Sequence, residues 1–294
     1  MKSYDNFGNI IVVKFPRSFS LKEKKKFAEK ILRKQKGVKT VLEKKEKIKG
    51  RLRKLSTNYI AGEKTKEVLY KENNCVFRFN IDKTYFSPRL SNERKEIASK
   101  IKKGEVVLVM FSGVAPYSIV IAKNSKAKKI FSNEISREAN KYARLNIALN
   151  KVKDKVELIP GDIKRLVKKW KSHPTPFPRT RDLAIMDYTR NRSTRNFANY
   201  KGYMRNRSPP TPDVIVMPRP QLKETFLKEA FSLSKTETRI YYYDFCKVDE
   251  IDSVIEKIKK EAKKYKKKIK ILNVKKAGEL APYKIRLRVD FMVL

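Results

Sequence analysis

The sequence has few of the residues on which most catalytic and metal sites depend. It contains one histidine and two cysteines in 294 residues, and neither Cys75 nor Cys246 has a C-x-x-C partner or a neighbouring histidine. The composition therefore gives no sign of a zinc site or a disulfide scaffold, and it rules out most histidine-dependent triads. Any general base is expected to be a carboxylate, a tyrosine or the backbone.

Acidic residues and long apolar runs are also scarce. Lys and Arg number 73 against 31 Asp and Glu, which gives a formal net charge of +42. Self-repulsion of this size favours a polyanionic partner, with nucleic acid first, over adaptation to heat or salt, because such adaptation raises both signs of charge together. No stretch approaches the ~20 apolar residues of a membrane span, and no signal peptide opens the chain. We therefore expect a cytoplasmic protein without a membrane partner.

The chain is long enough for two domains. Residues 1–86 are predicted to form a small lysine-rich α+β domain, with a helix over residues 21–33 and strands at residues 10–15, 38–42 and 76–81. Residues 87–294 are predicted to form the larger domain, which opens with a helix over residues 91–103 capped by Ser91. Its strands are expected at residues 106–110, 129–133, 156–159, 214–217, 238–243, 269–274 and 285–293. This pattern predicts a doubly wound α/β sheet whose last strands form an antiparallel edge.

The alternation of strands and helices breaks down between about residues 171 and 212. Basic and aromatic residues are interleaved there, and together they can contact a phosphate backbone and stack on unpaired bases. An insertion without a dedicated role fits this stretch equally well. Residues 182–187 also compete with residues 213–217 for the fourth strand, and we favour the latter because a proline and a predicted helix follow directly. The arginines expected to bind RNA are Arg89, Arg179, Arg181, Arg190, Arg192, Arg195, Arg205 and Arg207.

A turn rich in small residues follows the first strand of the larger domain. It reads Phe111-Ser112-Gly113-Val114-Ala115-Pro116, and Glu134 ends the next apolar run. Small residues there let the backbone approach a ligand, and an acidic side chain about twenty residues further on can accept hydrogen bonds from both hydroxyls of a ribose. The turn has fewer glycines than a pyrophosphate site requires. A nucleoside ligand without a pyrophosphate fits better, and S-adenosylmethionine is such a ligand.

Four segments together suggest a family. They are residues 85–94 (Tyr-Phe-Ser-Pro-Arg-Leu-Ser-Asn-Glu-Arg), the turn at residues 110–116, residues 146–150 (Asn-Ile-Ala-Leu-Asn) and residues 217–220 (Met-Pro-Arg-Pro). Over nearly its whole length the chain resembles the archaeal and eukaryotic tRNA (guanine-N1)-methyltransferases that act at position 37, with their wyosine-pathway relatives. The resemblance implies a Rossmann-like class I methyltransferase fold and S-adenosylmethionine as cofactor. It also implies the anticodon arm of tRNA as partner and methyl transfer to N1 of guanine 37, or to a wyosine-type derivative of it.

The resemblance also implies roles for single residues. Glu93 matches the family's base for the N1 proton, Arg53 the group that stabilises charge on O6, and Tyr85 a supporting hydroxyl. The residues matched to cofactor contacts are Arg94, Phe111, Gly113, Ala115, Glu134, Ile135, Asp162, Ile163 and Pro218. Structural roles remain open, since a helix dipole favours Glu93 whatever its function, Arg53 can hold phosphate, and Tyr85 can fill a core.

Three positions depart from the family pattern. Val109 stands where most members carry Asp, Ala115 replaces a second glycine, and Pro218 stands where guanine-37 enzymes usually have Asn. Two alternatives remain open, and Val109 and Pro218 suggest the second of them. One is transfer of the aminocarboxypropyl group of the same cofactor to a wyosine precursor, and the other is RNA binding by a protein that kept the fold and lost catalysis. Fuller-length relatives also carry a small domain that reads the tRNA elbow, and we expect this chain to begin after it.

Overall fold

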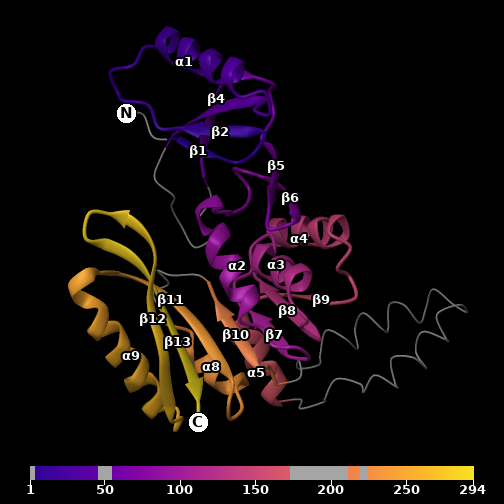
Figure 1. Cartoon of the computed structure of the whole chain (residues 1–294), viewed down its shortest axis with the longest axis vertical. Helices are drawn as coiled ribbons and strands as arrows, with labels where there is room; N and C mark the ends of the chain where they lie inside the picture. The colour runs from indigo at the N-terminus through magenta and orange to yellow at the C-terminus, as the bar shows by residue number, and fades with distance from the viewer. Residues whose placement is uncertain (1–3, 46–54, 173–210, 219–223) are drawn as a thin grey trace, which may run out of the picture.

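The computed structural model describes residues 4–45, 55–172, 211–218 and 224–294 (Figure 1). Arg53 and the seven arginines from Arg179 to Arg207 lie outside the described residues, as do residues 182–187. Within the described part the strands form three sheets of four, two and seven strands. None of the described helices has the length and apolar character needed to cross a membrane.

The four-stranded sheet lies at the N-terminal end of the chain and is covered by one helix (Figure 1). Its strands follow the order β1 (Tyr4–Asn6), β2 (Ile10–Val13), β3 (Thr40–Lys44) and β4 (Thr57–Gly62). Helix α1 (Leu21–Lys34) connects the parallel strands β2 and β3 and begins with a capping box, in which Ser20 and Glu23 bond to each other's backbone N–H. Ala28 and Ile31 of α1 pack on Val13 and Val41 of the sheet.

The two-stranded sheet, β5 (Glu67–Glu72) and β6 (Cys75–Asn80), is attached to helix α4 (Arg137–Leu149) by two asparagines. Asn150 accepts from the Val76 N–H at 2.9 Å and donates to the Val76 carbonyl at 2.7 Å. Asn146 accepts from the Arg78 N–H at 2.7 Å. Asn146 and Asn150 are four residues apart and therefore lie on one face of the helix. Their side chains supply to β6 the backbone hydrogen bonds that a neighbouring strand would otherwise make. The hairpin thus packs on the larger domain although it precedes residue 86, and the predicted boundary there stays a prediction.

The seven-stranded sheet has the strand order of the expected fold. It comprises β7 (Val106–Val109), β8 (Lys129–Glu134), β9 (Val156–Pro160), β10 (Val214–Met217), β11 (Arg239–Lys247), β12 (Ile269–Ala281) and β13 (Lys284–Val293). The order is β12-β13-β11-β10-β7-β8-β9, and β13 runs antiparallel to both of its neighbours. The predicted Rossmann-like sheet with an antiparallel edge is therefore confirmed. Since β10 pairs with β7 and β11, residues 213–217 do supply the fourth strand.

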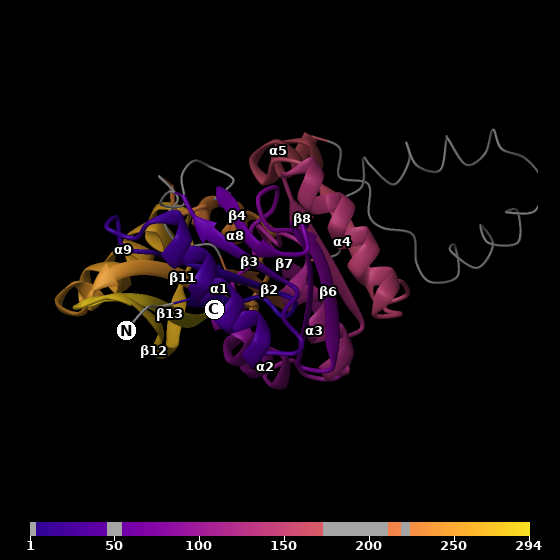
Figure 2. The same cartoon turned by 90° about the horizontal axis from the view of Figure 1, so that it is seen from above.

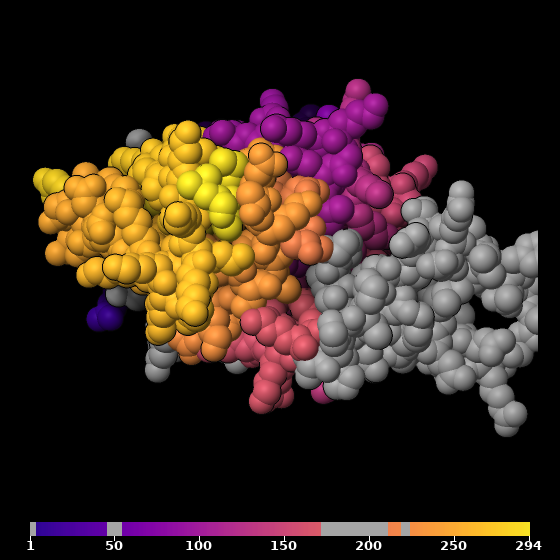
Figure 3. Space-filling view, turned by 90° about the horizontal axis from the view of Figure 1, so that it is seen from below, coloured from indigo at the N-terminus to yellow at the C-terminus, as the bar shows by residue number. Residues whose placement is uncertain are grey.

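Helices cover both faces of this sheet (Figures 1 and 2). Alternate strand residues point to opposite faces, so Val107 and Val109 pack with α2 (Ser91–Ser99), α3 (Pro116–Asn124) and α4. Leu108 and Met110 pack instead with α5 (Ile163–Ser172), α8 (Leu227–Leu233) and α9 (Ile251–Lys264). Viewed from below, the strands and helix at the C-terminal end form one half of the surface (Figure 3).

Two details of the predicted helix over residues 91–103 are wrong. Ser91 does not cap α2, because the 3-10 turn η1 (Pro88–Leu90) runs directly into the helix and makes Leu90 the residue before it. The Ser91 hydroxyl accepts from Asn73 instead. The helix also ends at Ser99, where the N–H of Lys100 already bonds to the carbonyls of Glu96 and Ile97. The sequence patterns also missed β1, β4, β5, α5 and α9.

Candidate active site at the carboxyl edge of the seven-stranded sheet

The turn after β7 bends sharply because several of its residues have left-handed backbone. Phe111, Gly113 and Ala115 have φ values of 56°, 58° and 67°. Residues other than glycine adopt this region of backbone conformation only at a cost in free energy. The N–H of Ser112 donates to the Asn133 carbonyl at 2.8 Å, which ties this turn to the end of β8. Phe111 packs edge-to-face on Phe226, with ring centres 5.0 Å apart. The turn therefore presents backbone N–H groups at the sheet edge.

Glu134, the last residue of β8, joins this turn to the next one. Its buried carboxylate accepts from the Gly113 N–H at 2.8 Å through Oε2 and from the Ser136 N–H at 2.7 Å through Oε1. Each oxygen keeps a further lone pair that a hydroxyl could use. Beside it, the buried Oγ of Ser112 has no hydrogen-bond partner within the described part of the chain. Because buried hydroxyls are normally bonded, the turn fits a polar ligand such as the ribose of a nucleoside.

The turn after β9 lies next to these two. The Asn133 side chain donates to the carbonyls of Ile159 and Gly161 at 2.9 and 3.0 Å, and the Gly161 N–H donates to the Glu134 carbonyl at 2.9 Å. Asp162 caps α5 by accepting from the Lys164 N–H at 3.0 Å. Neighbouring turns thus carry Glu134, Ile135 and Asp162 to one edge.

Two other residues matched to cofactor contacts, Ile163 and Pro218, have different surroundings from Glu134 and Asp162. Ile163 is buried in the core with α5 and α8, whereas Pro218 is half-buried directly after β10. Their predicted roles in binding the cofactor stay predictions.

Glu93 is buried in α2 and held by three side chains. Its Oε2 accepts from the Tyr243 hydroxyl at 2.9 Å and from the Arg288 guanidinium at 2.8 Å. Its Oε1 lies 3.1 Å from the ammonium group of Lys275, whose side chain is 40% exposed. Burial raises the pKa of Tyr243 well above its usual value, so this phenol stays protonated and donates to the carboxylate. Tyr117 of α3 reaches the same hydroxyl at 3.4 Å, which links Glu93 to the helix that follows the β7 turn.

Arg94 and Tyr85 belong to the segment that leads into α2, and their surroundings differ. The Arg94 side chain is 1% exposed, pairs with the buried carboxylate of Glu72 and donates to the Ser87 carbonyl at 3.0 Å. Its guanidinium also stacks on Phe86 and is enclosed by the protein, so its cofactor contact stays a prediction. The Tyr85 carbonyl lies 3.4 Å from the position that a Cβ at Gly113 would take. The segment before α2 therefore passes directly over the β7 turn.

Comparison with known proteins identifies the family in which this arrangement of residues occurs. A family model described as the TRM5/TYW2 methyltransferase domain matches residues 68–200, and one described as the TYW2 N-terminal domain matches residues 1–65. The tRNA (guanine(37)-N(1))/4-demethylwyosine(37)-methyltransferase Taw22 of Nanoarchaeum equitans is 33% identical, and the match covers 99% of this chain and 100% of the relative. The chain belongs to the TRM5/TYW2 methyltransferase family.

Solved structures of the TRM5/TYW2 family have the same fold. The crystal structure of Trm5b from Pyrococcus abyssi gives a TM-score of 0.76 at 29% identity, covering 99% of this chain and 74% of that one. Trm5 from Methanocaldococcus jannaschii in complex with adenosine gives 0.72 at 25% identity, with coverages of 99% and 74%. The predicted family and the methyltransferase fold are therefore confirmed.

The arginines that the sequence predicts to bind RNA are placed only in part. Arg89 is exposed and donates twice to Asp5 of β1, at 2.9 and 2.7 Å. This pair connects the segment before α2 to the N-terminal sheet. The role of Arg89 toward RNA stays a prediction.

Three residues around Glu93 were not expected from the sequence: Tyr243, Lys275 and Arg288. One pattern could have drawn attention to Arg288, because Arg286, Arg288 and Asp290 alternate with apolar residues in β13 and all three are buried. A strand with charged residues on a buried face must meet partners there. The sequence could not say that the partner of Arg288 would be Glu93.

Proposed function

We propose that this protein transfers the methyl group of S-adenosylmethionine to N1 of guanine 37 in tRNA, or to a wyosine-type derivative of that base. The proposal rests on two buried carboxylates, Glu134 at the end of β8 and Glu93 in α2. Glu134 lies among backbone N–H groups suited to a nucleoside, and Glu93 lies among cations suited to proton transfer. The full-length match to Taw22, whose name specifies both substrates, supports the choice of base.

The residues divide the work as follows. Glu134 would bind the cofactor ribose while the Gly113 turn approaches the nucleoside, and the bound cofactor supplies an electrophilic methyl group on a sulfonium sulfur. Glu93 would accept the proton that leaves N1 of guanine. Its Oε2 is already occupied by Tyr243 and Arg288, so the accepting atom is Oε1. Lys275 can leave Oε1 at small cost because partly exposed ion pairs contribute little stability.

Arg288 keeps Glu93 ready for this step. Its guanidinium donates to Oε2 of Glu93 at 2.8 Å and so leaves Oε1 to accept the proton. Arg288 is fully buried, and its other donors are occupied by Asp290 and Glu96, so it cannot turn away. The base is therefore fixed in position before the substrate arrives.

Methyl transfer from isotopically labelled S-adenosylmethionine to tRNA transcripts with guanine or adenine at position 37 tests the proposal. We expect label only on the guanine transcript, and a fall of about 100-fold or more in the single-turnover rate for Glu93→Gln. Lys95→Gln alters the exposed side of the same helix turn and should leave the rate unchanged. Unchanged labelling by Glu93→Gln would remove this carboxylate from the mechanism.

Mass spectrometry of the product nucleoside separates the alternatives. A methyl group supports the proposal, and an aminocarboxypropyl group contradicts it. The proposal would also be contradicted if the protein binds both S-adenosylmethionine and tRNA but transfers neither group.

A further inference from the structure

The turn that joins β12 to β13 carries an exposed tyrosine in an unfavourable backbone conformation. Pro282 and Tyr283 form this turn between Ala281 and Lys284, which pair with each other. Tyr283 has a φ of 60°, where turns favour glycine and a bulky side chain fits only at a cost. It is 81% exposed, so packing within the described residues does little to offset that cost. Strain of this kind is a reason to look for a function.

The backbone of this turn, residues 281–284, is held in place, and we call it the hairpin tip. The Val248 N–H donates to the Tyr283 carbonyl at 3.0 Å, which ties the hairpin tip to the residue directly after β11. Every residue of β11 from Arg239 to Lys247 also pairs with one residue of β13. An aromatic ring on a fixed backbone loses little conformational entropy when it binds. Tyr283 is therefore suited to contact a flat partner from outside the chain.

The hairpin tip extends beyond the carboxyl edge of the seven-stranded sheet. The last residue of β10, Met217, pairs with Tyr242, and β11 continues from there to Lys247. Lys247 pairs with Lys284, so the hairpin tip lies about 16 Å beyond the end of β10 at the usual rise of a strand. Figure 1 shows the hairpin in yellow passing the ends of β10 and β7 on the side where the N-terminal sheet lies. The turns around Glu134 belong to this same edge.

The charges at the hairpin tip favour a polyanion as the partner. Lys247 and Lys284 lie directly opposite each other on neighbouring strands, and like charges in this arrangement repel. Lys284 is exposed, and so is most of the Lys247 side chain, whose ammonium group lies 4.0 Å from Glu250. Phosphate groups would relieve the repulsion, and an aromatic ring beside lysines is suited to a nucleobase. Single-stranded RNA therefore fits this surface better than an apolar protein surface does.

We propose that the hairpin tip binds the anticodon loop of the tRNA, with Tyr283 stacked on a base next to guanine 37 and the two lysines on adjoining phosphates. The inference rests on the proposed function. Arg288, which binds Glu93, lies five residues from Tyr283, or about 16 Å along β13. A guanine that reaches Glu93 must leave the stack of its own strand. Its neighbours then lose a stacking partner and stay outside the pocket, beyond the sheet edge, where Tyr283 replaces that partner.

Fluorescence anisotropy with a labelled tRNA transcript tests the stacking contact. We expect Tyr283→Gly and Tyr283→Leu to bind about tenfold more weakly and Tyr283→Phe to bind as the wild type does, because stacking requires the ring and not the hydroxyl. Leu294→Gly removes an exposed apolar side chain directly after the other end of β13 and should also bind as the wild type does. Wild-type affinity in Tyr283→Leu would show that the position needs only an apolar side chain, and would overturn the inference.

Transcripts with an abasic nucleotide at position 36 or 38 identify the stacked base. At one of these positions the change should weaken binding to the wild-type protein about tenfold. The same change should have little further effect on Tyr283→Gly, because that variant has already lost the contact. If the two losses multiply at both positions, Tyr283 does not stack on a neighbour of guanine 37, and the inference is overturned.

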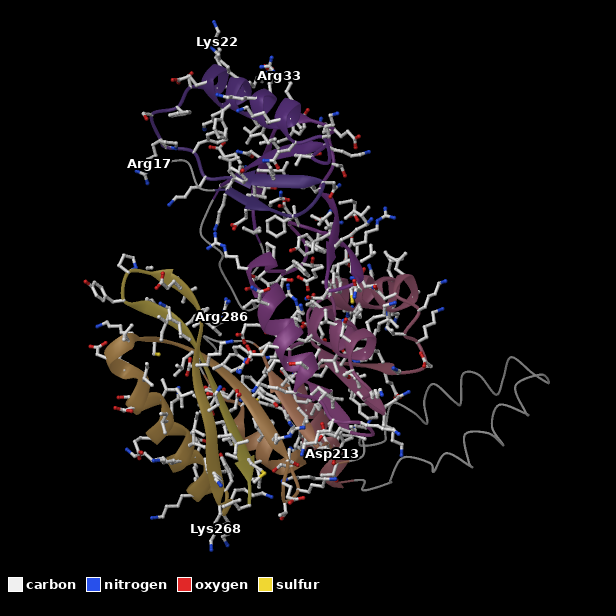
Figure 4. The ribbon with its side chains drawn as sticks, viewed as in Figure 1. Arg17, Lys22, Arg33, Asp213, Lys268 and Arg286 are labelled. Atoms are coloured by element: carbon white, nitrogen blue, oxygen red, sulfur yellow. The ribbon has the colours of Figure 1, made fainter. Side chains whose placement is uncertain are left out.

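The salt dependence of tRNA binding tests the lysines. Lys284→Gln should make the slope of log K against log salt shallower by about one, because one phosphate contact is lost. Lys268→Gln removes an exposed charge before the other end of β12, which Figure 4 shows far from the hairpin tip, and should leave the slope unchanged. An unchanged slope in Lys284→Gln would overturn the phosphate contact.

Two further measurements separate folding and function from this contact. Glycine relieves the left-handed strain, so the Tm of Tyr283→Gly should equal or exceed that of the wild type, and a clear fall would show a structural role and overturn the inference. If the wild-type protein methylates no tRNA but binding still depends on Tyr283 and one neighbouring base, the proposed function fails and the contact stands. If Tyr283→Gly binds and methylates tRNA as the wild type does, the contact fails and the proposed function stands.

Discussion

At the scale of single residues, the two buried carboxylates of the site differ in their partners. Glu134 meets backbone N–H groups, which are fixed in place and leave its outer lone pairs to a ligand. Glu93 meets side chains of three other elements, one of which is exposed enough to move. The first environment suits binding without chemistry, and the second suits proton transfer. Environment, more than residue type, assigns the two roles.

Glu134→Gln is predicted to weaken binding of S-adenosylhomocysteine by about 10- to 150-fold. The amide keeps one accepting oxygen but loses the charge, and hydrogen bonds to charged groups are worth about 1.5–3 kcal/mol. Isothermal titration calorimetry measures the change. Glu138→Gln, on the first turn of α4, is the matched control and should bind as the wild type does. Equal affinity in both variants would show that Glu134 only ties the two turns together.

Glu96 is predicted to make part of the stability depend on pH. Burial alone would raise its pKa, but the hydrogen bonds and charges of Arg288 and Lys275 outweigh burial and lower the pKa to about 2. Because the folded value lies below the unfolded one, the contribution is complete above about pH 4.5 and is lost as pH falls toward 2.

Thermal unfolding against pH checks this dependence. Glu96→Gln should be less stable at pH 7 by about 2 kcal/mol or less, since the group is partly exposed, and the difference from the wild type should close between pH 4.5 and 2. Glu256, paired with Lys259 on the exposed side of α9, serves as control, and Glu256→Gln should change little. A difference that stays constant across this range would contradict the assignment.

The sequence identified part of the site in advance. Glu134 could be found because it ends an apolar run at the expected distance from the turn, and Glu93 because its segment matched a family motif. Arg288 could not be paired with Glu93, which lies 195 positions away in the chain, because only the antiparallel placement of β13 beside β11 brings them together.

At the scale of elements, the strands of the large sheet and the helices α1 and α4 were predictable, since their apolar residues follow the right period and Ser20 and Ser136 cap the two helices. The hairpin strand β5 was missed because its exposed and buried positions carry mixed residue types. Helix α9 was missed although Val254, Ile258 and Ala262 follow a helical spacing, because lysines surround them.

The attachment of the β5–β6 hairpin to α4 is predicted to depend on Asn150. Asn150→Ala removes two hydrogen bonds from the backbone of Val76, so we expect a loss of about 2 kcal/mol and faster hydrogen exchange of the Val76 amide. Arg144→Ala, on the exposed side of the same helix, should change stability by less than about 0.5 kcal/mol. If the Val76 amide exchanges at the same rate in both variants, the asparagine does not hold the strand.

At the scale of the whole molecule, the positive charge lies on more than one part of the chain. Figure 4 shows Arg17, Lys22 and Arg33 at the N-terminal end, where Lys22 and Arg33 extend from the exposed side of α1. The site itself balances cations with buried carboxylates, as around Glu93. Attraction of a polyanion therefore belongs to the outer surface, and chemistry to the sheet edge.

This separation predicts that salt will weaken tRNA binding far more than cofactor binding. A protein with a net charge of +42 that neutralises 6–10 phosphates should lose about 10³- to 10⁵-fold in tRNA affinity between 50 and 200 mM salt. Fluorescence anisotropy with a labelled transcript measures the slope of log K against log salt. The affinity for S-adenosylhomocysteine, measured over the same range, should change by less than about twofold because its contacts are buried. A tRNA slope shallower than about −2 would mean that few phosphates are contacted and that the surplus charge is not used for RNA.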